Sequence, residues 1–209
     1  EIISKNNLNK LSEFFSSSQI NDFSKILFEE ITYKKNKDGI VGLIESKENS
    51  IKNFQLSKNP YILIAESPEK PGNIGALLRT ADAAGMDGLI ISNPSTELYN
   101  PNSVRSSLGS LFTMQIAIDS TENIIDFLKK NKIKIYSTFI ENSVNYLDIN
   151  YKEPCAIVVG KESSSLSNLW EIESDNLIKV PMKGKMDSLN LSVCAAIVIF
   201  EGLKQRNGN

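Results

Sequence analysis

Residues 61–91 read YILIAESPEKPGNIGALLRTADAAGMDGLII, and this stretch decides the expected fold class. It begins with an apolar run at 61–65 and ends with a second run at 88–91. Between them, apolar residues recur at helical spacing and share one helix face: Ile74, Leu77, Leu78, Ala81 and Gly85. Continuous apolar runs are typical of strands buried on both faces of a parallel sheet, and such strands need a crossover helix between them. The stretch therefore predicts a βαβ unit.

The same alternation continues toward the C-terminus. Further strands are predicted at 114–118, 133–139, 155–159 and 177–180, and further helices around 124–128 and at 191–203. We therefore expect an α/β domain over 60–209, with a mostly parallel sheet and helices on both faces.

The N-terminal quarter has a different pattern. A helix is predicted at 8–15 and strands at 26–31 and 39–45, which gives a small α+β domain over 1–52. Residues 51–59 are polar and end in Asn59-Pro60, a dipeptide that disfavours helix. We therefore place a linker at 53–59.

Composition excludes several classes of site. The 209 residues include no histidine, which removes Ser-His-Asp and Cys-His catalysis and most zinc sites, and no metal is expected. Cys155 and Cys194 lie in apolar surroundings and are predicted to be buried thiols. No apolar run approaches the roughly 18 residues that span a bilayer, and no secretory pattern opens the chain, so we expect a cytoplasmic protein without a membrane contact.

The global charge does not indicate nucleic-acid binding. The net charge is −2 and the pI is about 5.4, so any such binding needs a local basic cluster. Candidates for that cluster are Arg79, Arg105, Lys161, Lys179, Lys183 and Lys185.

Three glycine-containing stretches follow predicted strands: 71–81 (PGNIGALLRTA), 158–167 (VVGKESSSLS) and 180–195 (VPMKGKMDSLNLSVCA). Ligands of α/β sheets collect at the carboxyl ends of strands. Taken singly, each stretch also fits an ordinary loop that leads into a capped helix. None matches a dinucleotide-binding or P-loop motif. The residues alone therefore predict an α/β protein with a polar site at its strand ends.

Taken together and in this order, the three stretches resemble the signature motifs of the SpoU/TrmH-type RNA 2′-O-ribose methyltransferases of the SPOUT class, over about 60–206. The first motif is matched by Asn73, Gly75, Arg79, Thr80 and Ala81, the second by Gly160, Glu162, Leu166 and Ser167, and the third by Val180, Pro181, Met182, Gly184, Ser188, Leu189 and Asn190. Ser165 stands where the second motif has a glycine, a residue that often marks a positive φ. Residues 1–52 resemble part of an L30e-like RNA-binding domain.

The resemblance implies a C-terminal trefoil knot, S-adenosyl-L-methionine as cofactor, a homodimer through the knot domain and an RNA substrate, ribosomal RNA in preference to transfer RNA. Its implied catalytic residues are Arg79, Asn73, Glu162, Ser188 and Asn190. Its implied cofactor-binding residues are Thr138, Phe139, Gly160, Val180, Met182, Ser188 and Leu189. Its implied RNA-binding residues are Arg79, Arg105, Ser107 and Lys161. A non-catalytic RNA-binding relative and an α/β enzyme acting on a small molecule are the alternatives. The helix at 191–203 fits either a dimer interface or an intramolecular core.

Overall fold

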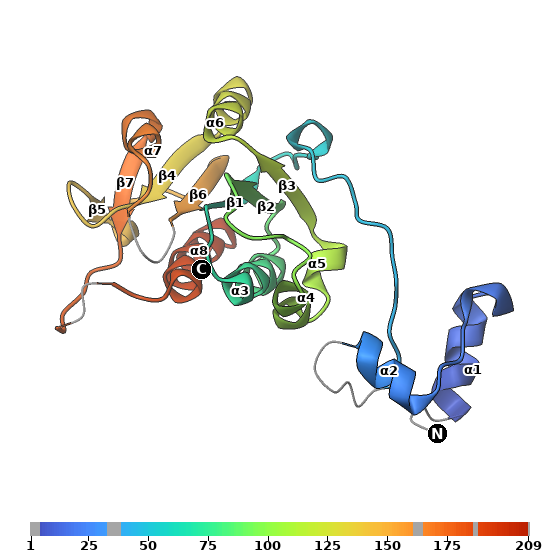
Figure 1. The fold of residues 1–209 in the computed structure, drawn as a ribbon. Helices are drawn as coiled ribbons and strands as arrows, with labels where there is room; N and C mark the ends of the chain where they lie inside the picture. Colours follow the sequence, from blue (N-terminus) through green and yellow to red (C-terminus); the bar gives the residue numbers. More distant parts are fainter. Residues whose placement is uncertain (1–4, 33–38, 161–164, 186–187, 209) are drawn as a thin grey trace. The chain divides into compact units, whose positions relative to one another are not determined.

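The computed structural model describes residues 5–32, 39–160, 165–185 and 188–208. The chain divides into two compact units, Glu1–Lys47 and Glu48–Asn209, which are considered separately. Figure 1 shows the elements of both.

The N-terminal unit contains helices where the sequence predicted one helix and two strands. Helix α1 (Lys5–Phe14) confirms the first prediction, and η1 (Ser17–Gln19) follows it. The strand predicted at 26–31 is wrong, because these residues form α2 (Lys25–Ile31). Ser24 caps that helix by accepting a hydrogen bond from the Leu27 amide at 3.3 Å, and a short apolar run by itself does not distinguish a strand from a helix. No strand forms at 39–45 either.

The larger unit is built on a seven-stranded sheet whose neighbouring strands are all parallel. Its order is β3-β2-β1-β6-β4-β7-β5. The six strands predicted in this region are confirmed, whereas the two-residue β5 was too short to predict. The strands are β1 (Tyr61–Glu66), β2 (Gly88–Ser92), β3 (Gln115–Asp119), β4 (Lys134–Thr138), β5 (Val144–Asn145), β6 (Cys155–Val159) and β7 (Asn176–Lys179). The trefoil knot concerns how the chain threads between these strands, and it stays a prediction.

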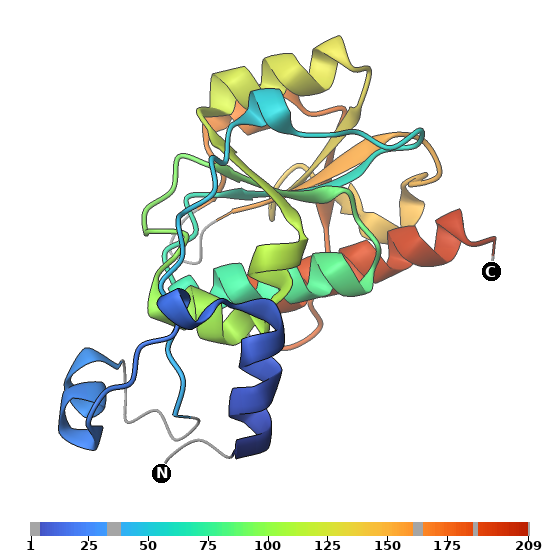
Figure 2. The same cartoon turned by 90° about the vertical axis from the view of Figure 1, so that its right-hand side faces the viewer.

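Helices cover both faces of this sheet, as Figure 2 shows. One face carries α3 (Pro71–Ala83), α4 (Pro101–Ser107), α5 (Ser110–Thr113) and α8 (Leu191–Arg206). The other carries α6 (Thr121–Lys130) and α7 (Asn168–Glu173), and η3 (Tyr146–Asp148) follows β5. A hydrophobic core lies on each face of the sheet, and alternate residues of β1 pack into each. Leu63 packs into the α3-side core, and Ile62 and Ile64 pack into the α6-side core. The predicted α/β fold with two covered faces is therefore confirmed.

The segment predicted as the end of the first domain and the start of a linker packs against this sheet. It contains η2 (Ile51–Asn53), and the Ile51 and Phe54 side chains are buried in the α6-side core. The Ile118 amide also donates to the Asn49 carbonyl at 2.7 Å. The compact unit therefore begins at Glu48, before the predicted linker.

Cys155 and Cys194 are free thiols, as the sequence predicted. Cys155 is fully buried, and its burial raises the pKa of the thiol to about 11. Cys194, on α8, is half-buried, and burial raises its pKa as well. Within the described ranges, no helix has both the length and the apolar character needed to cross a bilayer.

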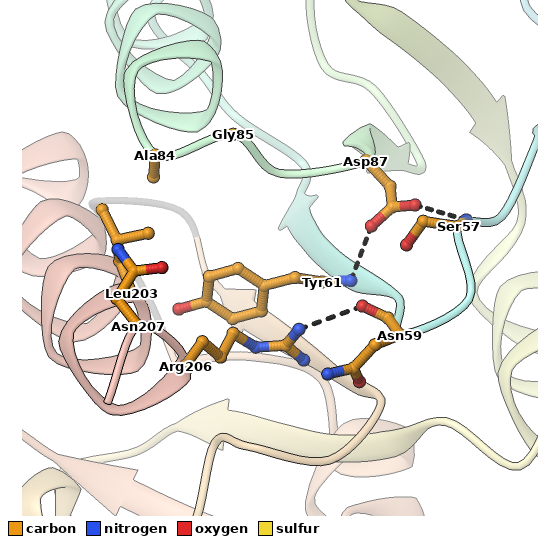
Figure 3. A pocket seen from close by; sticks show the side chains of 9 residues that line it. All are labelled: Ser57, Asn59, Tyr61, Ala84, Gly85, Asp87, Leu203, Arg206 and Asn207. Atoms are coloured by element: carbon orange, nitrogen blue, oxygen red, sulfur yellow. Dashed lines mark hydrogen bonds between the residues drawn. The ribbon is translucent and has the colours of Figure 1, made fainter. Parts of the chain in front are cut away.

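A cavity of about 390 Å³ lies at the amino ends of the strands, where α8 ends (Figure 3). The Arg206 guanidinium lies 4.4 Å from the centre of the Tyr61 ring. It donates to the carbonyls of Asn59 at 3.0 Å, Pro60 at 3.0 Å and Glu153 at 2.7 Å. The Tyr61 hydroxyl in turn donates to the Ile199 carbonyl at 2.9 Å. These side chains fasten the C-terminal helix to the sheet.

We expect Arg206→Ala to destabilise the protein by about 2 kcal/mol, because it removes three hydrogen bonds to carbonyls and a cation–π contact. For a chain of this size, that loss lowers the melting temperature by about 4 to 8 °C. Thermal unfolding followed by circular dichroism measures it. An unchanged melting temperature would show that these contacts add nothing to the attachment of α8.

Candidate functional site

The first motif forms the start of α3. Pro71 begins the helix, and its carbonyl accepts a hydrogen bond from the Ser103 hydroxyl at 3.0 Å. Asn73, only 9% exposed, faces inward, whereas Arg79, six residues later, is exposed. The helix face that the sequence predicted for Arg79, away from the core, is confirmed.

The motif glycine Gly75 is required by the contact between α3 and α4. A Cβ atom at this position would lie 2.0 Å from the Ser106 Oγ atom, 2.6 Å from the Ser107 amide nitrogen and 2.7 Å from the Ser103 carbonyl oxygen. Real side chains essentially never come this close to backbone atoms. Gly75 therefore allows the backbones of the two helices to approach each other.

Helix α4 was not predicted, although its start carries a recognisable signal. The Asn100 side chain caps it by accepting from the Asn102 amide at 2.9 Å, and Pro101 occupies the first helical position. Asn followed by Pro is a typical helix start. The short helix ends at Ser107, its C-cap residue Leu108 has a φ of 49°, and Arg105 is exposed to solvent.

A cavity of about 480 Å³ lies between these two helices. Arg79 and Arg105 both line it, one from each helix. Neither forms an ion pair with a carboxylate of the described residues. Two guanidinium groups without acidic partners favour a phosphate or another anionic group. The other lining residues are Gly72, Asn102, Ser106 and Leu108.

The third motif meets the first at the start of α8. Asn190 caps α8, because its Oδ1 atom accepts from the Ser192 amide at 3.0 Å and from the Ser192 hydroxyl at 2.7 Å. Its Nδ2 atom lies 3.5 Å from Asn73 Oδ1, to which it donates. The asparagines of two motifs separated by more than a hundred residues are therefore neighbours.

We expect Asn190→Ala to cost about 1 kcal/mol of stability, because the start of α8 loses its cap. The melting temperature should fall by about 2 to 4 °C. Asn190→Asp, which keeps the capping oxygen, should retain most of that stability. Calorimetric melting of both variants measures the difference. Equal losses in the two variants would contradict the capping role.

The predicted cofactor residues follow three adjacent strands, β6, β4 and β7. The Thr138 hydroxyl donates to the Val158 carbonyl at 3.1 Å, and the Phe139 amide donates to the Ile178 carbonyl at 2.9 Å. Val180 follows β7 and packs partly against the α3-side core. These strands all run in one direction, so their carboxyl ends form one edge of the sheet.

The three sequence stretches that carry the motifs all reach the α3-side core. It contains Ile74 of 71–81, Val159 of 158–167 and Leu191 of 180–195, whereas Leu166 of the second motif packs into the α6-side core. The sequence stretches that resemble one family are therefore held in one packed region.

The model of the SpoU rRNA Methylase family matches residues 60–200, well over half of the chain. The chain belongs to the SpoU rRNA Methylase family.

Named members of the SpoU family are similar to this chain over most of its length. The 23S rRNA (uridine(2479)-2′-O)-methyltransferase of Streptomyces viridochromogenes is 29% identical over 173 residues, which is 80% of this chain and 60% of that protein. The 23S rRNA (guanosine(2553)-2′-O)-methyltransferase RlmP of Bacillus subtilis is 28% identical over 200 residues, 96% of this chain and 79% of RlmP. The chain therefore spans less than two thirds of the Streptomyces relative.

A solved SpoU structure confirms the fold. The SpoU methyltransferase AviRb from Streptomyces viridochromogenes, in complex with the cofactor AdoMet, aligns with a TM-score of 0.74 and 29% identity. The alignment covers 79% of this chain and 68% of AviRb.

The remaining motif residues of this SpoU family member fall into three groups. Ser188 and Met182 are exposed and Leu189 is half-buried in the segment before α8. Lys161 and Glu162 lie outside the described residues. Ser165, which stands where the second motif has a glycine, is described and exposed.

Ser107, predicted to contact RNA, is buried inside the protein. It is only 1% exposed, and its hydroxyl donates to the Val104 carbonyl at 2.7 Å within α4. Its amide lies against Gly75. This geometry gives Ser107 a packing role, and the polar groups that face the cavity instead come from Asn102 and Ser106, which sequence reasoning missed.

Proposed function

We propose that this chain transfers a methyl group from S-adenosyl-L-methionine to a ribose 2′-hydroxyl of RNA. Membership of the SpoU family, two relatives named as 23S rRNA 2′-O-methyltransferases and the AdoMet complex of AviRb support this reaction. The observation that carries it is the cavity lined by Arg79 and Arg105, because it places beside the first motif two guanidinium groups that form no ion pair with the described residues.

On the RNA side, we assign the two arginines different roles. Arg105 binds backbone phosphate, as a guanidinium on a solvent-facing helix does in many nucleic-acid interfaces. Arg79 holds the reacting ribose and stabilises negative charge as it develops on the 2′-oxygen. A guanidinium has no acceptor and keeps its proton, so Arg79 does not act as the base. As the bond from the 2′-oxygen to the methyl group would form and the sulfur–methyl bond would break, the hydroxyl proton would pass to solvent water. Asn73, Asn190, Ser188 and Glu162 complete the proposed catalytic set, and Lys161 is a further proposed RNA contact.

On the cofactor side, the carboxyl edge of β6, β4 and β7 fits an adenosyl group. Its residues are partly accessible and combine apolar side chains with main-chain groups at strand ends. When bound, S-adenosyl-L-methionine supplies a methyl group already activated by the sulfonium. The residues proposed to hold it are Thr138, Phe139, Gly160, Val180, Met182, Ser188 and Leu189.

We propose ribosomal RNA of the 23S type as the substrate, with the N-terminal unit, Glu1–Lys47, contributing to its selection. Both relatives described above carry 23S rRNA in their names, although they are named for different nucleotides, a uridine and a guanosine. The cytoplasm, where ribosomal RNA is modified, is the proposed location.

We also propose a homodimer through the knot domain. Helix α8 buries Leu191, Ala195, Val198 and Ile199 in its own unit, yet leaves Val193 47% exposed and Phe200 46% exposed. Apolar side chains left on the outer face of a helix are suited to a second copy. Light scattering after size exclusion measures the mass, and Phe200→Asp should shift the protein toward the monomer.

Incubation with S-adenosyl-L-methionine labelled on its methyl group tests the reaction. The acceptors are purified 23S rRNA and transfer RNA in parallel, and the labelled nucleotide is identified after digestion. We expect label on one 2′-oxygen of 23S rRNA. Label only on transfer RNA would overturn the proposed substrate, and label on neither RNA would favour a non-catalytic RNA-binding relative.

A further inference from the structure

We propose that Glu66 is a positioning residue that holds the base of the loop between β6 and α7 in place for cofactor binding. Glu66 is not part of the three motifs. The inference rests on the proposed function, because the second motif lies in this loop. Of the loop, the structure describes residues 160 and 165–167.

The Glu66 carboxylate is buried, and the described residues that hydrogen-bond to it are all neutral donors. Glu66 ends β1 and is 7% exposed. Its Oε2 atom accepts from the Ser167 amide at 2.7 Å. Its Oε1 atom accepts from the Ser167 hydroxyl at 2.7 Å, the Trp170 indole at 3.1 Å and the Thr121 hydroxyl at 3.3 Å. Within the described part of the chain, no lysine or arginine forms an ion pair with it.

The hydrogen bonds around Thr121 also point toward this carboxylate. The Asn93 side-chain amide donates to Thr121 Oγ1 at 3.0 Å, and Ser92 Oγ lies 2.5 Å from the same atom. Because a hydroxyl has a single proton, and Thr121 gives its proton to Glu66, Ser92 must be the donor to Thr121. The carboxylate is thus the terminal acceptor of a buried hydrogen-bond network. This position requires a group that accepts hydrogen bonds on both of its oxygens.

Glu66 reaches one end of the β6–α7 loop, and the sheet fixes the other. Ser167 is the N-cap residue of α7, directly after the loop, and it donates both its amide and its hydroxyl to Glu66. Before the loop, Val159 of β6 pairs in register with Ala65 of β1, next to Glu66. Strand β1 therefore holds both ends of the loop through consecutive residues.

The two ends of the loop also contact each other. A Cβ atom at Gly160 would lie 3.2 Å from the Leu166 side chain and 3.4 Å from the Leu166 amide. Leu166 is 6% exposed and packs into the α6-side core. A shift of Ser167 would therefore be passed to Leu166 and to Gly160, which is one of the proposed cofactor residues.

Glu66→Gln tests this role with almost no change in shape. A glutamine amide has one acceptor oxygen and one NH2 group, so in either orientation the NH2 group faces a donor of this network. The orientation that keeps the three contacts of Oε1 places NH2 against the Ser167 amide. We expect the Kd for S-adenosylhomocysteine to rise about tenfold in calorimetry, because an unsatisfied buried donor is enough to displace the segment. At saturating cofactor, kcat should stay within about twofold.

Two further variants separate positioning from general stability. Ser167→Ala removes one donor on the loop side and leaves the backbone bond, so it should raise the same Kd by a smaller factor, and it keeps the proposal testable if Glu66→Gln does not fold. Thr121→Val removes a donor on the α6 side and should lower the melting temperature while leaving the Kd unchanged. If all three variants lower the melting temperature and none changes the Kd, Glu66 only stabilises the fold.

Amide hydrogen exchange of residues 160–167 in the cofactor-free protein gives a readout independent of activity. We expect faster exchange in Glu66→Gln than in Thr121→Val, and equal exchange would overturn the proposal. If the unsubstituted protein binds no S-adenosylhomocysteine, the proposed function fails, and the exchange measurement alone then decides whether Glu66 holds this segment.

Discussion

Arg79→Ala should lower kcat for RNA methylation about a thousandfold, the loss typical of removing a group that stabilises developing negative charge. Arg79 lines the cavity between α3 and α4, and no carboxylate of the described residues forms an ion pair with it. Its exposed guanidinium supports no part of the core, so the melting temperature should hardly change. Single-turnover kinetics at saturating cofactor and RNA measure the chemical step directly.

Two comparisons make this result specific. The Kd for S-adenosylhomocysteine should be unchanged in Arg79→Ala, because the proposed cofactor residues lie at the ends of β6, β4 and β7. Arg105→Ala should instead weaken RNA binding about tenfold and leave kcat nearly intact, as expected for a phosphate contact. If Arg79→Ala retained its kcat and showed only a higher KM for RNA, the residue would be a second phosphate contact without a part in the reaction.

How far the sequence could predict this structure depends on how many residues carry each signal. Strands β1 and β6 each contain five consecutive apolar residues, followed by Glu66 in β1 and by Gly160 after β6, and both strands were predicted correctly. The segment 26–31 also begins with three apolar residues, but it contains Glu29 and Glu30 and lies beside a serine cap, and it forms a helix. A short apolar run does not indicate which segments it packs against, and these contacts decide whether it forms a strand or a helix.

Site residues that belong to a sequence motif could be predicted. Residues whose role depends on packing between distant segments could not. Asn73 and Asn190 were singled out from separate stretches, and the structure makes them neighbours. Glu66 gave a weaker signal, an acid at the end of a buried strand, and its role depends on Ser167 and Trp170 about a hundred residues away. Ser107 was assigned to RNA by the family resemblance, but its side chain is buried and its amide lies against Gly75 of α3.

Gly75→Ala should affect both stability and activity. The added methyl group would meet the Ser107 amide nitrogen at 2.6 Å and the Ser103 carbonyl oxygen at 2.7 Å, and these backbone atoms cannot rotate away. Helix α4 must therefore move from α3. Overpacking of this kind costs about 1 to 3 kcal/mol, which lowers the melting temperature by roughly 2 to 12 °C.

Activity should fall further than stability explains. Arg105 is on α4 and Arg79 on α3, so separating the helices changes the distance between the two guanidinium groups that line the cavity. A displacement of about 1 Å at a reacting group is able to cost about a hundredfold in rate. We therefore expect kcat/KM for RNA to fall about a hundredfold at a temperature where the variant is fully folded, measured with the same methylation assay.

Two controls isolate the cause. Gly72→Ala adds a methyl group to the same helix where nothing lies within 4 Å, so its melting temperature should not fall. Gly75→Ala combined with Ser106→Ala removes the hydroxyl at 2.0 Å but leaves the two backbone clashes, so it should restore little. Full restoration by the double variant would place the clash in the Ser106 side chain. Little restoration would mean that this glycine is needed for the close approach of two backbones, which sets where Arg105 stands relative to Arg79.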